Sequence, residues 1–113
     1  MTESGSRQRL AAILAADVVG YSRLMTADEH ATMAALDAAR AIFRSRIESS
    51  QGRVIDMAGD SVLAVFDSAT GAISAALAVQ EALEAAARTA SDDRRMRFRI
   101  GVHLRAAMFT PSP

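Results

Sequence analysis

The middle of the chain, residues 53–66, reads RVIDMAGDSVLAVF. Two short runs rich in valine, isoleucine and leucine, Arg53–Ala58 and Ser61–Phe66, flank the dipeptide Gly59-Asp60. Glycine and aspartate between two apolar runs are typical of a tight turn that joins antiparallel strands. The stretch therefore predicts a β-hairpin with Asp60 at its tip.

Helical patterns lie on both sides of this hairpin. Apolar residues before it recur every three or four positions, which predicts a helix from about Ala27 to Ser49. Thr26 and Glu29 have the spacing of a capping box at its start. After the hairpin, Ser68 can cap a second helix. The expected inner faces are Met33, Leu36, Ala39, Ile42, Phe43 and Ile47 in the first helix and Ile73, Ala76, Leu77, Gln80, Leu83 and Ala87 in the second.

Further strands are predicted outside the two helices. Leu10–Val19 is a short apolar run that ends at a glycine, and Met96–Leu104 alternates strictly between apolar and polar or small residues. The resulting order, β-α-β-β-α-β, is the ferredoxin-like arrangement. We therefore expect an α+β fold with a four-stranded antiparallel sheet and two helices on one face. Residues 9–104 form this domain, between a flexible tail, 1–8, and an irregular tail, 105–113.

Composition excludes several classes of function. The 113 residues contain no cysteine and no lysine, so disulfides, thiolate metal sites and lysine Schiff bases are excluded. Thirteen basic and thirteen acidic residues balance, so no strong field favours nucleic acid or a membrane as a partner. The longest uncharged run, residues 68–80, is too short to span a bilayer. We expect a cytoplasmic protein.

Two aspartates stand out in the predicted fold. Asp17 lies near the end of the first strand and Asp60 at the hairpin tip. The first and third strands of a ferredoxin-like sheet are neighbours, so the two carboxylates can approach one another. Paired carboxylates without histidine or cysteine suit Mg²⁺ or Mn²⁺, and two such ions about 3.5–4 Å apart can catalyse phosphoryl displacement. The same residues also suit an ordinary turn and hairpin.

Other polar residues carry weaker signals. The turn after Asp17 contains Gly20, and backbone amides near a helix start can hold phosphate oxygens. His30 and His103 lack neighbours at metal-ligand spacing, which favours solvated or structural roles. A basic cluster near the last strand is more typical of a solvated polar face than of a partner or phosphate surface; it consists of Arg94, Arg95, Arg97 and Arg99.

Three segments together resemble the catalytic domain of bacterial class III adenylate/guanylate cyclases: RLAAILAADVVGYSRLM (9–25), DMAGDSVLAVF (56–66) and RFRIGVHL (97–104). The resemblance implies that Asp17 and Asp60 bind two Mg²⁺ or Mn²⁺ ions, with the backbone carbonyl of Val18 at the second. It also implies conversion of a nucleoside triphosphate to a 3′,5′-cyclic nucleotide and pyrophosphate. The residues implied at the triphosphate are Val19, Gly20, Tyr21 and Ser22.

The chain departs from the family pattern in two respects. Asp56 stands where many relatives have a purine-reading lysine, so ATP and GTP both stay open as substrates. The family's later half carries a catalytic asparagine and arginine; this sequence has no asparagine, and Arg105 lies in a different context. We therefore interpret the chain as a truncated cyclase domain, inactive alone, that pairs with a second copy or with an intact cyclase.

Two alternatives stay open. The chain could be a non-catalytic, cyclase-like module for nucleotide binding or dimerisation. It could also be a diguanylate-cyclase-like domain, which shares the fold and the use of carboxylates but has a Gly-Gly-Asp-Glu-Phe turn that is absent from this sequence.

Overall fold

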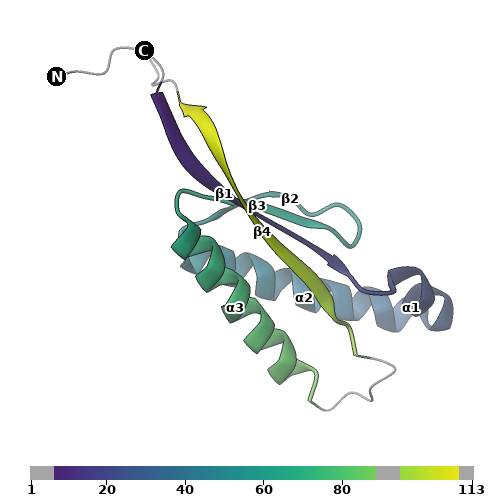
Figure 1. Cartoon of the computed structure of the whole chain (residues 1–113). Helices are drawn as coiled ribbons and strands as arrows, with labels where there is room; N and C mark the ends of the chain where they lie inside the picture. The colour runs from purple at the N-terminus through teal and green to yellow at the C-terminus, as the bar shows by residue number, and fades with distance from the viewer. Residues whose placement is uncertain (1–6, 89–94, 110–113) are drawn as a thin grey trace.

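A computed structural model of the chain describes residues 7–88 and 95–109 (Figure 1). The predicted α+β class and strand order are confirmed, with one additional short helix after the first strand. The elements in chain order are β1 (Arg7–Val18), α1 (Tyr21–Ala27), α2 (Glu29–Ser49), β2 (Arg53–Asp56), β3 (Val62–Phe66), α3 (Ala69–Ala86) and β4 (Phe98–Phe109).

The four strands form one sheet in the order β2-β3-β1-β4, and every neighbouring pair is antiparallel. This is the ferredoxin-like order, and β2 and β3 form the predicted hairpin. The helices α2 and α3 lie side by side on one face of the sheet, and the other face is open (Figure 1). The central strand β1 therefore contacts β3 on one side and β4 on the other.

The pleat of β1 separates its residues between the two faces. Ala12, Leu14, Ala16 and Val18 are buried against the helices, because alternate side chains of a strand point to the same face. Asp17 lies between two of these buried residues and so belongs to the open face. The alternation of β1 thus places this carboxylate away from the core.

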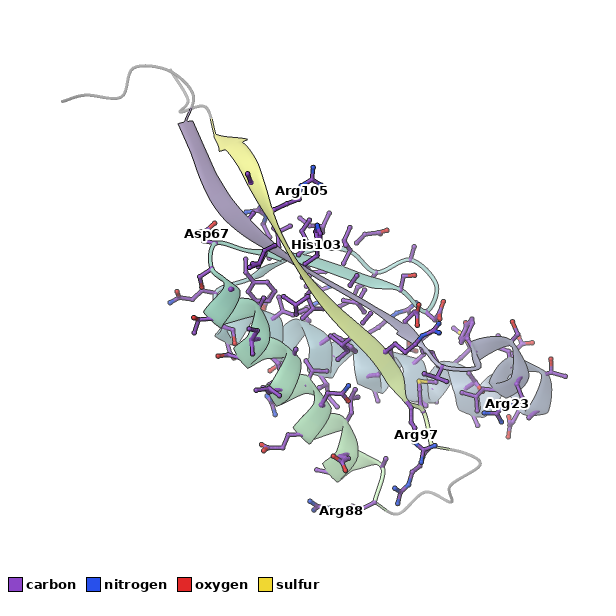
Figure 2. All side chains as sticks on the ribbon, in the orientation of Figure 1. Arg23, Asp67, Arg88, Arg97, His103 and Arg105 are labelled. Carbon is purple, nitrogen blue, oxygen red and sulfur yellow. The ribbon has the colours of Figure 1, made fainter. Side chains whose placement is uncertain are left out.

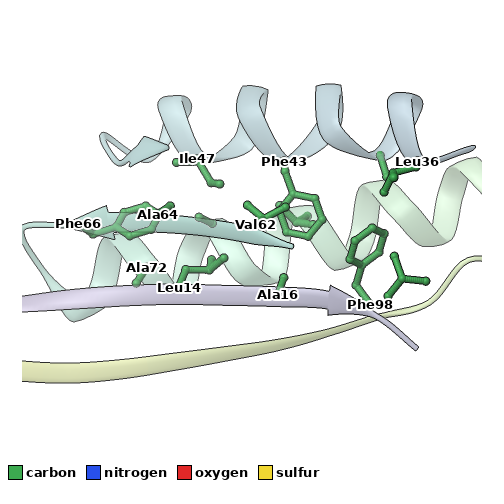
Figure 3. Close-up of a cluster of buried hydrophobic side chains, with 14 of the residues drawn as sticks. Leu14, Ala16, Leu36, Phe43, Ile47, Val62, Ala64, Phe66, Ala72 and Phe98 are labelled. Carbon is green, nitrogen blue, oxygen red and sulfur yellow. The ribbon is translucent and has the colours of Figure 1, made fainter. Parts of the chain in front are cut away.

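The core fills the space between the sheet and the two long helices (Figure 3). Its largest fully buried side chains are Phe43, Leu14, Leu36, Ile47 and Val79. Phe43 of α2 meets Phe98 of β4 edge to face, with ring centroids 4.9 Å apart. This aromatic pair connects the helical layer to the edge strand that carries the third sequence segment.

The first helical region differs from its prediction. The capping box at Thr26 was wrong: Asp28 is extended, ends α1, and accepts a hydrogen bond from the amide of Ala31 as the N-cap of α2. Aspartate is a strong N-cap because its side-chain oxygen accepts from an unpaired amide of the first turn. The buried hydroxyl of Thr32 donates to the carbonyl of Leu24 at 2.9 Å and joins the two helices.

The inner face of α3 was predicted correctly only in part: Ala76 and Leu83 pack against the core, as expected. Ser68 caps this helix as expected, but Ala72, Ala75 and Val79 are its buried residues. Ile73 and Leu77, predicted to face inward, are 50% and 66% exposed. Alanine side chains let a helix approach its neighbours closely, so the small residues, not the large ones, form the contact.

The two longest strands extend beyond their predicted ends. β1 begins at Arg7 and β4 continues to Phe109, and these two residues pair. Residues 7–8 and 105–109, predicted to belong to the tails, are therefore strand, because each strand supplies the other with backbone hydrogen-bond partners. The other residues of the two predicted tails lie outside the described residues. No helix in the described ranges is long and apolar enough to cross a membrane.

Gly52 provides a test of the packing at the start of β2. A Cβ atom there would lie 2.3 Å from the buried ring of Phe66. We expect Gly52→Ala to lower the free energy of unfolding by about 1–3 kcal/mol, because overpacking forces the ring or backbone to move. Urea denaturation measures this change. Gly101→Ala is the control, since a Cβ there meets nothing within 4 Å; equal midpoints for both variants would contradict the packing argument.

Candidate functional site

The end of β1 meets the turn between β2 and β3. The pairing of β1 with β3 ends at Ala16 opposite Val62, so the next amide that faces this side has no strand carbonyl to bind. That amide belongs to Val18, and it donates to Oδ2 of Asp60 at 3.1 Å. The carboxylate thus replaces the missing strand partner. As a result, Asp60 contacts the residue directly after Asp17.

Arg99 contacts Asp17 from the other neighbouring strand. The two residues are register partners on β1 and β4, and Nε of Arg99 donates to Oδ1 of Asp17 at 2.9 Å. The hydrogen bond to Asp17 and the charge of Asp17 raise the pKa of Arg99, and the charge of Asp60 adds a smaller effect. The side chains are 72% and 45% exposed, so this is a solvent-accessible ion pair. Both carboxylates therefore act on one guanidinium.

An open depression of about 580 Å³ extends from this ion pair across the open face of the sheet. The depression forms where Ala15 and Gly101, which are register partners, contribute almost no side chain above the sheet. Its size falls within the range of small-molecule clefts, roughly 300–1,000 Å³. The lining residues include Ala15, Asp17, Asp56, Leu63, Arg99 and Gly101. The structure thus brings Asp56 into the same depression as Asp17.

The turn after Asp17 connects the site to α1. The side chain of Val18 is buried, and the amide of Val19 donates to the carbonyl of Arg97 at 2.8 Å. Gly20 has φ +66°, which explains glycine at this position, and it is the N-cap residue of α1. Tyr21 is half-buried and Ser22 is exposed in the first turn of the helix. The contact of this turn with a triphosphate stays a prediction.

The histidines and Arg105 lie apart from the two aspartates. Within residues 7–88 and 95–109, no three histidine, cysteine, aspartate or glutamate side chains gather as a metal-ligand group. His30 is exposed on α2. His103 and Arg105 lie along β4, well away from Arg23 of α1 (Figure 2). The register partner of Arg105 on β1 is Ala11, so Arg105 does not lie opposite Asp17. The metal ligands that the resemblance implies, Asp17, Asp60 and the carbonyl of Val18, stay a prediction.

Arg99 is the site residue that sequence reasoning missed. It was grouped with neighbouring arginines as a solvated polar face, and one of these, Arg94, lies outside the described residues. The useful signal was the alternation of the last strand, which places Arg99 on the same face as Gly101 and His103. Had the register of this strand against β1 been known, Asp17 would have been recognised as its partner.

Comparison with known proteins gives the family. No family model matches the chain. A crystal structure of an adenylate/guanylate cyclase/hydrolase from Silicibacter pomeroyi matches 92% of the chain with a TM-score of 0.79 and 32% identity. A protein of Rhizobium meliloti (strain 1021) named "Putative adenylate cyclase 3" is 46% identical over 105 residues, which are 92% of the chain. The chain belongs to the class III adenylate/guanylate cyclase family.

The chain corresponds to part of its relatives. It spans 61% of the S. pomeroyi cyclase chain and 18% of the R. meliloti protein. A bacterial light-regulated adenylyl cyclase has a TM-score of 0.76 over 93% of this chain and 63% of its own, at 16% identity. At that identity the likeness concerns the fold alone. The resemblance found in the sequence is therefore confirmed for a portion of the cyclase catalytic domain.

The bond between Asp60 and Val18 can be tested by substitution. We expect Asp60→Ala to lower the free energy of unfolding by about 1–3 kcal/mol and to expose the amide of Val18 to exchange, because the amide loses its acceptor. Asp60→Asn retains an acceptor oxygen and should have a smaller effect. Urea denaturation and amide hydrogen exchange measure the two quantities. Asp56→Ala is the control, since Asp56 is exposed; an equal loss in both alanine variants would contradict this role.

Proposed function

We propose that this cyclase-family chain binds a nucleoside triphosphate together with divalent metal ions at the end of β1. The observation that carries the proposal is the hydrogen bond between Val18 and Asp60, which brings a second carboxylate beside Asp17. The depression that Asp17 lines gives space for a ligand. The chain would thus provide the metal-binding part of a cyclase site.

The residues present fit hard divalent cations. Carboxylate and carbonyl oxygens are the ligands that Mg²⁺ and Mn²⁺ prefer. Only Oδ2 of Asp60 has a hydrogen-bond partner among the described residues, so its other oxygen is available. Asp17, Asp60 and the carbonyl of Val18 would hold the ions. When bound, such ions stabilise negative charge on the oxygens of a phosphoryl transfer.

A divalent cation and Arg99 would compete for Asp17. Arg99 occupies one oxygen of this carboxylate in the structure. Because the ion pair is exposed, water can replace either partner at little cost, and a metal ion can displace the guanidinium. Arg99 would then be a cation close to the metal site and suited to phosphate oxygens. This exchange would couple metal binding to recognition of the triphosphate.

Base choice depends on Asp56 in this proposal. Its ionised carboxylate accepts hydrogen bonds and cannot donate one, unlike lysine. A guanine edge offers N–H donors to such a group, whereas the lysine contact to adenine is lost. Asp56 is exposed, and it lines the same depression as Asp17. ATP and GTP therefore both belong in the binding experiments.

Nucleotide binding should depend on the two aspartates. We expect weak, Mn²⁺- or Mg²⁺-dependent binding of ATP or GTP by the wild-type chain in titration calorimetry. The double variant Asp17→Asn, Asp60→Asn should reduce the affinity at least roughly tenfold, because charge-assisted metal ligands are lost. The double variant Glu81→Gln, Glu84→Gln on α3 is the control with the same change in charge. Equal affinities in all three proteins, or binding that is insensitive to a chelator, would refute the proposal.

Turnover should require a second protein. The sequence contains no asparagine, so the family's catalytic asparagine has no counterpart here, and Arg105 lies away from Asp17 as the register partner of Ala11. Each preorganised group that meets developing charge contributes roughly 10²–10³ in rate. We therefore expect no measurable cyclic nucleotide from this chain alone.

Complementation gives the matching positive test. The chain is mixed with an intact relative whose own metal aspartates have been substituted, and cyclic nucleotide is measured. Activity in the mixture that is lost with Asp17→Asn is the expected result. Product from this chain alone would overturn the proposed inactivity, and a demonstrated complex without activity would overturn the proposed supply of metal ligands.

A further inference from the structure

Helix α2 extends two arginines to the turn that carries Asp60. Arg40 donates from Nη2 to the carbonyl oxygen of Gly59, the residue directly before Asp60. Arg44, one helical turn later, approaches the sulfur of Met57 with Nη2 at 3.7 Å. Through these contacts, a helix on the opposite side of the sheet from the open depression reaches the loop at the candidate metal site.

The guanidinium of Arg40 is held in a defined position. Its Nη1 lies 3.2 Å from Oδ1 of Asp37, one turn earlier on α2, and its side chain is only 28% exposed. Its Nε is buried and has no hydrogen-bond partner among the described residues. A buried donor without a partner costs free energy, so the stability of α2 does not explain an arginine here. The contact that needs the length and donors of arginine is the one to Gly59.

We propose that Arg40 is a positioning residue for Asp60, an inference that rests on the proposed function of the aspartates. Gly59 has φ +57°, and a Cβ there would meet nothing within 4 Å, so the glycine provides a backbone conformation and no packing. Such a residue has the greatest backbone freedom in the chain. Arg40 restricts that freedom by binding its carbonyl. The peptide plane that leads into Asp60 is thereby fixed.

Asp60 is thus held from two sides. Arg40 fixes the backbone before it, and the amide of Val18 fixes one oxygen of its carboxylate. This leaves the second oxygen with a defined direction at the end of β1. Without Arg40, the bond to Val18 alone would hold the carboxylate, and a metal ion that attracts the same group would weaken that bond. Loss of Arg40 should therefore lower metal affinity without removing any ligand.

The experiment compares Arg40→Gln and Arg40→Lys in the full chain. Arg46→Gln is the matched control, because Arg46 is an exposed residue of the same helix and, within the described part of the chain, its guanidinium hydrogen-bonds only to the hydroxyl of Ser45. The readouts are amide hydrogen exchange at Val18, with the buried Leu14 of β1 as an internal reference, and the affinity for Mn²⁺ alone.

We expect Arg40→Gln to speed exchange at Val18 about tenfold relative to Leu14 and to weaken Mn²⁺ binding roughly five- to tenfold, the effect of one charge-assisted hydrogen bond. Arg40→Lys, which retains one donor, should restore part of both effects. Arg46→Gln should change neither.

Two outcomes would overturn the positioning role. If exchange at Val18 and Leu14 rises equally in Arg40→Gln, the arginine only contributes stability. If exchange at Val18 rises but Mn²⁺ affinity equals that of the wild type, Arg40 does not act on the site. Failure of the proposed function gives a different pattern, in which the double variant Asp17→Asn, Asp60→Asn binds Mn²⁺ as well as the wild type does. In that case the exchange rate of the Val18 amide in Arg40→Gln still shows whether Arg40 holds Asp60 in place.

Discussion

The structure depends on the double pairing of β1. This strand binds β3 on one side and β4 on the other, so its backbone cannot rotate and its side chains must alternate between the helical layer and the open face. Ala16 and Val18 belong to the core, which forces Asp17 between them to the open face. The position of the first candidate ligand is therefore a consequence of core packing.

The end of β1 gathers the remaining charges by the same logic. β3 begins at Val62, opposite Ala16, so no residue of this strand pairs with Val18. The carboxylate of Asp60 accepts the hydrogen bond of the Val18 amide in place of a strand carbonyl. β4 continues past this point and places Arg99 opposite Asp17. The contacts that complete the sheet are thus the contacts that assemble the site. A substitution at these contacts should therefore change stability and ligand binding together.

Local patterns predicted much of this molecule. The strand over Phe98–Leu104, the Gly59-Asp60 turn and the capping residue Ser68 each depend on neighbours in the sequence, and these predictions are confirmed. The predicted core face of the last strand does not extend to Val102 and Leu104, which are 37% and 47% exposed because the helices do not cover that end of the strand. The errors arose where distant groups decide. Ile73 and Leu77 are large and apolar, yet the helix turns its alanines inward because these allow closer approach to α2 and the sheet. The break at Asp28 was missed because threonine and aspartate are both common N-cap residues, and the sequence around Thr26 and Asp28 does not show which of the two precedes the long helix.

Periodicity, turn chemistry and motif order lie in adjacent residues, so the element types and the family could be predicted from the sequence, which also singled out Asp17 and Asp60. The contact of Arg99 with Asp17, and that of Arg40 of α2 with Gly59, became visible only in the folded chain. Both contacts join elements whose relative register and depth follow from packing of the whole core. That information is distributed over many buried side chains, so no single stretch of sequence carries it.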